Sequence, residues 1–107
     1  MIKDFFEKHA KGVYTEVRIA DADFIEAVIL VVEYDHWKKQ LKSFLGGPLK
    51  DSGIKPSQEH NAITTPYGGI NENQTLFAGE REGRSIIAML WPWQDGKHIT
   101  LKLKEVI

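Results

Sequence analysis

The sequence has no cysteine and almost no net charge. The missing cysteine excludes disulfides, thiolate metal sites and thiol nucleophiles. The 14 Lys and Arg residues nearly balance the 15 Asp and Glu residues, which gives a formal net charge of −1. Proteins that bind nucleic acids normally need a basic excess to neutralise phosphates. We therefore expect neither thiol chemistry nor a nucleic-acid partner.

Long apolar runs are also missing. The longest run, Ala27 to Val32, covers six residues, whereas a helix that spans a bilayer needs about 20. The N-terminal residues 1–8 carry closely spaced charges and lack the apolar region of a signal peptide. We expect a cytoplasmic protein without a membrane partner. The length of 107 residues fits a single domain that comprises residues 1–107.

Residues 2–11 and 35–45 have the spacing of amphipathic helices. Gly12 follows the first segment, and Gly46-Gly47-Pro48 follows the second, so both have a typical helix end. Asp35 is the expected N-cap of the second helix. The sides expected to be buried comprise Ile2, Phe5, Phe6 and His9 in the first helix and Trp37, Leu41, Phe44 and Leu45 in the second.

Strand patterns account for most of the remaining chain. Residues 13–20 alternate between apolar and polar positions. Residues 24–34 fit either a strand or a helix, and their β-branched residues favour a strand. We expect a third, fourth and fifth strand at residues 74–79, 84–93 and 97–106, separated by turns at 80–83 and 95–96. This order predicts an α+β fold: an antiparallel sheet of about four to five strands, helices packed on one face, and a C-terminal three-stranded meander.

The turn Asp95-Gly96 predicts the register of the last hairpin, because Asp-Gly between two strand patterns is a strong signal for a two-residue loop. The resulting pairs on one side of the sheet are Trp93 with His98, Trp91 with Thr100, Met89 with Lys102 and Ile87 with Lys104. The pairs on the other side are Leu90 with Leu101 and Ala88 with Leu103, beside Ile86 and Ile99. This second side is wholly apolar, and we expect it to face the core.

The first side then carries a row of four large apolar side chains: Ile87, Met89, Trp91 and Trp93. Monomers seldom expose such a stripe. We expect it to be covered by residues 46–73, by a second subunit in a homodimer, or by a protein or small-molecule partner. Residues 46–73 are too long for a bare connection, and we expect helical turns from Ser57 to Ile63 and a turn at 66–69 within them.

Aromatic residues and glycines concentrate in Tyr67-Gly68-Gly69 and in Trp91-Pro92-Trp93. Rings beside flexible glycines suit contact with a ligand or partner, although the same residues would also suit a second small core beneath residues 46–73. The candidate residues for partner binding are Tyr67, Met89, Trp91, Trp93 and His98.

Catalytic and metal-binding patterns are not evident. The four histidines lack the spacing of a metal site, and the serines lack the GxSxG motif. We therefore predict no catalytic residue, metal or cofactor. The favoured hypothesis is a non-catalytic binding or interaction module that uses the Trp91/Trp93 face, and self-association is one way in which that face could be covered. The alternative is a small enzyme with a site between residues 46–73 and the C-terminal hairpin, where Glu59, His60 and His98 would have to converge.

Overall fold

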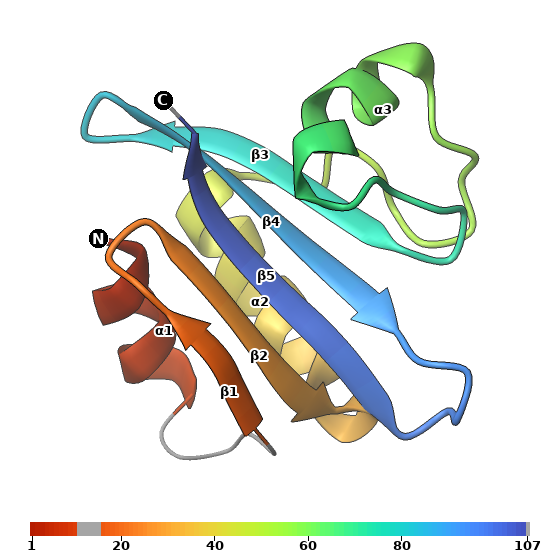
Figure 1. Ribbon diagram of the computed structural model, residues 1–107, viewed down its shortest axis with the longest axis horizontal. Helices are drawn as coiled ribbons and strands as arrows, with labels where there is room; N and C mark the ends of the chain where they lie inside the picture. Colours follow the sequence, from red (N-terminus) through yellow and green to blue (C-terminus); the bar gives the residue numbers. More distant parts are fainter. Residues whose placement is uncertain (11–15, 107) are drawn as a thin grey trace.

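The computed structural model describes residues 1–10 and 16–106 (Figure 1). Its described strands form one antiparallel five-stranded sheet in the order β1-β2-β5-β4-β3. The elements are α1 (Ile2–Ala10), β1 (Glu16–Ala20), β2 (Phe24–Leu30), η1 (Val31–Glu33), α2 (Tyr34–Leu45), α3 (Gln58–Thr64), η2 (Thr65–Tyr67), β3 (Thr75–Arg81), β4 (Arg84–Pro92) and β5 (His98–Val106). The predicted α+β fold and the C-terminal meander β3–β4–β5 are confirmed.

The N-terminal elements follow the predicted pattern where the structure describes them. Helix α1 ends at Ala10, and the expected last residue, Lys11, lies outside the described residues together with positions 13–15 of the expected first strand. The ambiguous segment 24–34 is a strand as far as Leu30 and then a single 3₁₀ turn. The preference for a strand was therefore correct for residues 24–30 and wrong for residues 31–34.

Helix α2 begins earlier than its predicted cap. The N-cap is Glu33, which makes no capping hydrogen bond through its side chain, and Asp35 lies in the first turn of the helix. The prediction of Asp35 as the N-cap was wrong because η1 leads directly into α2, so the backbone is already helical at Glu33. The carboxylate of Asp35 still lies where the helix dipole favours a negative charge.

The main core lies between one face of the sheet and the helices α1 and α2. The buried residues of α2 are Trp37 and Leu41. The ring centres of Phe5 and Phe6 from α1 lie 6.2 and 5.7 Å from the ring centre of Trp37. The sheet contributes Ile25, Ala27, Ile29, Phe77, Ile86, Ala88, Leu90, Ile99, Leu101 and Leu103. This is the apolar side that the hairpin register assigned to the core.

A second, smaller core lies on the opposite face of the sheet. Its buried members are Ile70, Leu76, Ile87 and Met89, with Ile63 and Tyr67 packed against them. In Figure 1, α3 lies in front of the sheet and α2 lies behind it. The fold prediction had the helices on one face, whereas α3 lies on the other face, within the cover that residues 46–73 were expected to provide as one alternative.

We expect Leu41→Ala to lower the free energy of unfolding by about 2–5 kcal/mol, the usual cost of truncating a buried leucine. Leu41 of α2 is fully buried against the sheet. Lys39→Ala, on the exposed side of the same helix, is the matched control and should change stability by less than about 0.5 kcal/mol. Urea titrations of both variants would measure this difference, and equal stabilities would show that α2 does not bury this side.

Candidate functional site

Residues 46–73 form the layer that covers the second core, and Lys50 fixes this segment to β3. The Lys50 backbone bridges to Leu76, with Lys50 N to Leu76 O at 3.2 Å and Leu76 N to Lys50 O at 2.9 Å. The side chain is buried, and its Nζ donates to the carbonyl oxygens of Asp51, Glu72 and Gln74 at 3.0, 2.9 and 2.6 Å. All three ammonium hydrogens are thus used. Burial lowers the pKa of Lys50, but its bonding is that of a structural clamp.

Helix α3 is closed at its start by a reciprocal capping box. The Ser57 hydroxyl accepts from His60 N at 3.2 Å, and His60 Nδ1 accepts from Ser57 N at 3.0 Å. The helix follows Ser57 and ends at Thr64, close to the helical turns that the sequence predicted. His60 is therefore engaged in capping its own helix.

The turn after α3 rests on Trp91. The Lys102 ammonium donates to the Tyr67 carbonyl at 3.1 Å and lies 3.7 Å from the centre of the Trp91 ring. Gly68 has a φ of +105°, and a Cβ on Gly68 would lie 2.6 Å from Cη2 of Trp91. The turn can approach the indole this closely only because residue 68 has no side chain.

Substitution of Gly68 tests this close approach. Gly68→Ala should destabilise the protein by about 1–3 kcal/mol more than Gly69→Ala, because only the first variant adds a clash with the indole. Gly69 is the matched control: its φ is also positive, at +81°, but a Cβ there would meet nothing within 4 Å. Thermal or urea unfolding measures both variants. Equal losses would mean that backbone strain alone explains the effect.

The predicted apolar row on β4 is partly covered. The register is as the Asp95-Gly96 turn predicted, with Trp91 opposite Thr100, Met89 opposite Lys102 and Ile87 opposite Lys104. Ile87 and Met89 are 4% and 1% exposed beneath residues 46–73. Trp91 is half-buried against the same segment. The expected cover by residues 46–73 is therefore present for these three positions.

Trp93 lies beyond this cover and is 36% exposed. Its indole Nε1 donates to Thr100 Oγ1 at 2.8 Å, and its ring lies 4.9 Å from the His98 ring. The Arg18 guanidinium lies 5.6 Å from the indole centre. The five predicted site residues thus divide into two groups: Tyr67, Met89 and Trp91 in the second core, and Trp93 and His98 at the end of the hairpin. Met89 is too deeply buried to touch a partner directly.

Asp95 organises the end of this hairpin. Its carboxylate accepts hydrogen bonds from Lys97 N at 2.8 Å and from His98 N at 3.1 Å, and its Oδ2 lies 2.6 Å from His98 Nδ1. These bonds lower the pKa of Asp95 from 3.8 to about 2, and the bond from the Lys97 amide makes the largest contribution. The charged carboxylate therefore holds the backbone and the imidazole of His98 beside Trp93.

The low pKa of Asp95 predicts a loss of stability in acid. Because the folded pKa is below the unfolded value, this contribution is present above pH 3.8 and is lost as the pH falls through about 2. Asp95→Asn should therefore lose less stability than the wild type over that interval. Unfolding in urea at several pH values measures the difference. Identical acid profiles would show that Asp95 does not titrate in this way.

Exposed apolar side chains gather at the same end of the sheet. Leu30, Val31, Val32 and Trp93 are 44, 41, 78 and 36% exposed, and we call them the hairpin-end patch. Backbone bonds hold the segments that carry the patch side by side: Leu30 pairs with His98, Val31 N donates to Lys97 O at 2.8 Å, and Trp93 N donates to His98 O at 2.9 Å. Sequence reasoning missed Leu30, Val31 and Val32. The available signal was the run Ala27 to Val32, which continues past the end of the strand.

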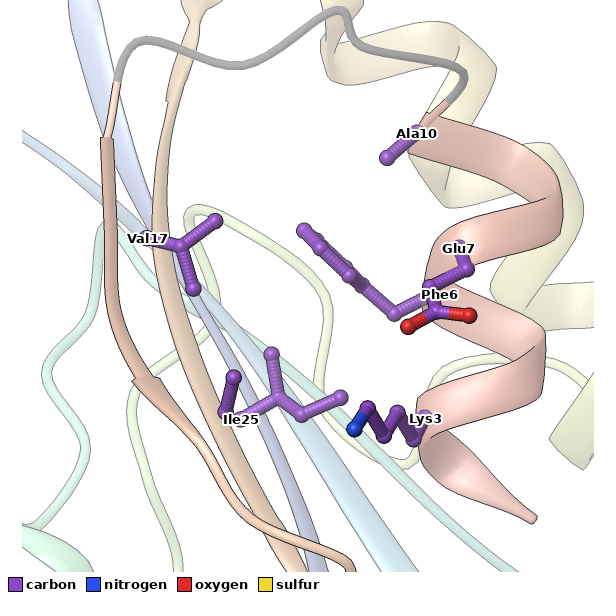
Figure 2. A pocket seen from close by; sticks show the side chains of 7 residues that line it. Lys3, Phe6, Glu7, Ala10, Val17 and Ile25 are labelled. Carbon is purple, nitrogen blue, oxygen red and sulfur yellow. The ribbon is translucent and has the colours of Figure 1, made fainter.

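A hollow of about 390 Å³ separates α1 from β1 and β2 (Figure 2). Phe6 extends from α1 toward Val17 and Ile25, while Lys3 and Glu7 belong to the helical side of the hollow. Ala10, which lines the hollow, directly precedes residues 11–15 in the sequence, and these lie outside the described part of the chain. This hollow therefore does not define a candidate site.

A second hollow, the α3 groove, lies between the segment α3–η2 and the sheet and has a volume of about 500 Å³. Its lining comprises Ala62, Ile63, Pro66, Tyr67, Ala78, Gly79, Glu80, Ser85, Ile86, Ile87 and Val106. Glu59, His60 and His98 are not among these residues. His98 begins β5 and Val106 ends it, which places His98 about 26 Å along the strand from the groove. The three residues that the enzyme hypothesis needs are thus not brought together here.

Across residues 1–10 and 16–106, no three or more histidine, aspartate or glutamate side chains are grouped as a metal site would require. None of the helices in this described part is long and apolar enough to span a membrane. The cytoplasmic location expected from the sequence stays a prediction.

Comparison with known proteins gives no match: no family model, no curated protein and no solved structure is significantly similar to this chain.

Proposed function

We propose that this chain is a non-catalytic interaction module that forms a symmetric homodimer through the hairpin-end patch. The observation that carries this proposal is the gathering of four of the six large, exposed apolar side chains of the described residues at one end of the sheet. An exposed apolar patch of a few hundred Å² on a monomer is often a binding surface.

The charges around the patch support a second copy of the chain as the partner. Arg18 lies against Trp93, and Asp95 and Lys97 belong to the adjoining turn, so both signs of charge flank the apolar centre. A symmetric dimer brings the same patch of two subunits together, and each subunit can then offer acidic groups to the basic groups of the other. A polar rim around an apolar centre is also the usual composition of protein interfaces.

This proposal refines the contact that the sequence predicted. Residues 46–73 already cover Ile87 and Met89, so the row on β4 contributes mainly Trp93 to the contact. Leu30, Val31 and Val32 supply the remainder. The alternative, a small enzyme, has less support because the lining of the α3 groove lacks Glu59, His60 and His98.

The test is the mass of the protein in solution, measured by light scattering over a concentration series. We expect a dimer for the wild type and a monomer for Val32→Glu, because a charge in the centre of the contact would lose its hydration. Val32 is 78% exposed, so this change should leave the fold intact. Ile54→Glu is the matched control, since Ile54 is 56% exposed outside the patch, and this variant should stay dimeric.

Trp93→Glu should also give a monomer, with circular dichroism as the check that the sheet is still folded. A wild type that stays monomeric at the highest concentration reached would contradict the proposal. A folded Val32→Glu variant that remains dimeric would contradict it equally.

A further inference from the structure

The α3 groove exists because α3 is attached to the sheet at only one end. Thr64, at the C-terminal end of the helix, is its only buried residue. The chain that follows is fixed by the bond from Gly69 N to Thr64 O at 2.9 Å and by the bond from Lys102 to the Tyr67 carbonyl. These two bonds hold the end of α3 and the turn that follows it, and the volume of about 500 Å³ is typical of small-molecule sites.

The sheet register gives the groove an apolar part and a polar part. Ala78 and Ile87 form a pair on the floor, and Ile63 packs against the same cluster from α3. The next pair on the same side of β3 and β4 is Glu80 with Ser85. A carboxylate and a hydroxyl thus stand side by side at one end of an otherwise apolar hollow.

The charge of the lining selects the kind of ligand. Among the described residues of the lining, Glu80 is the only acidic one, and none is a lysine, arginine or histidine. Within the described residues, Glu80 takes part in no ion pair. An anionic ligand would instead meet the like charge of Glu80.

We propose that the α3 groove binds a small amphipathic amine. The hydrocarbon body lies on Ile63, Ala78 and Ile87, and the ammonium group donates to the Glu80 carboxylate and the Ser85 hydroxyl. The occupant is thus a hydrophobic molecule with one positive head group. This site is separate from the hairpin-end patch, and binding there does not depend on dimer formation.

The experiment compares octylamine with octanoate, which have chains of equal length and head groups of opposite charge. Amide NMR spectra of the labelled protein are recorded during titration, below the concentrations at which either compound aggregates. Octylamine should shift the amides of residues 62–67, 78–80 and 85–87 and should bind more tightly than octanoate. Equal affinities, or shifts centred on the hairpin-end patch, would overturn the proposal.

Glu80→Gln removes the charge without changing the shape of the groove. It should weaken octylamine binding by about two- to fivefold, the range of an exposed ion pair, and should reduce the preference over octanoate. Glu82→Gln is the matched control, because Glu82 is exposed in the adjacent turn and is not part of the lining. Equal weakening by both variants would show a general charge effect and contradict a site at Glu80.

Ala62→Trp tests the location of the hydrocarbon body independently of charge. Ala62 is an exposed lining residue, so a large ring there should fill the groove without disturbing either core. We expect binding of octylamine to fall below detection. Unchanged binding in the folded variant would show that the amine lies elsewhere.

Discussion

Strand β4 must be shielded from water on both of its sides, and most of the architecture follows from this constraint. Ile86, Ala88 and Leu90 face the helices α1 and α2, whereas Ile87 and Met89 face the other way. A sheet with one apolar face needs one covering layer, but a strand that is apolar on both sides needs two. The chain supplies the second layer from residues 46–73.

Lysines contribute much of the bonding of this second layer: Lys50 bonds within it, Lys38 joins it to α2 and Lys102 joins it to the sheet. Lys50 binds three carbonyl groups, Lys102 binds the Tyr67 carbonyl, and Lys38 of α2 pairs with Asp51 at 2.9 Å. Buried charges are costly unless they are fully hydrogen-bonded, and Lys50 meets that condition. The same arrangement leaves α3 attached at one end, which creates the groove, and leaves Trp93 beyond the cover, which creates part of the hairpin-end patch.

The features that were predicted from the sequence depend on local patterns. The Asp95-Gly96 turn and the alternation on β4 were enough to set the register of the last hairpin, and the spacing of Trp37 and Leu41 identified the buried side of α2. The features that were missed depend on contacts between distant residues. The position of β2 beside β5 and the burial of Lys50 arise from tertiary packing. Lysine is normally an exposed residue, so no local pattern predicts a buried clamp at Lys50.

The candidate sites also divide into features that local sequence patterns predicted and features that depend on contacts between distant residues. Trp93 and His98 were found because hairpin pairing puts them together, and the structure adds the exposed run Leu30 to Val32, which lies beside them only through the pairing of β2 with β5. The α3 groove has no local signature, since its walls come from residues 62–67 and from three strands. Its acidic end depends on Glu80 being opposite Ser85 in the sheet.

Residues 46–73 form an integral layer of the fold, and native-state hydrogen exchange tests this most directly. The decisive amides are those of Lys50 and Leu76, which bond to each other's carbonyl groups, with Leu101 in the sheet centre as the reference. We predict that all three exchange with nearly the same opening free energy, because the second layer unfolds with the sheet. Exchange of Lys50 and Leu76 orders of magnitude faster than that of Leu101 would show that the segment opens independently, and would contradict this account.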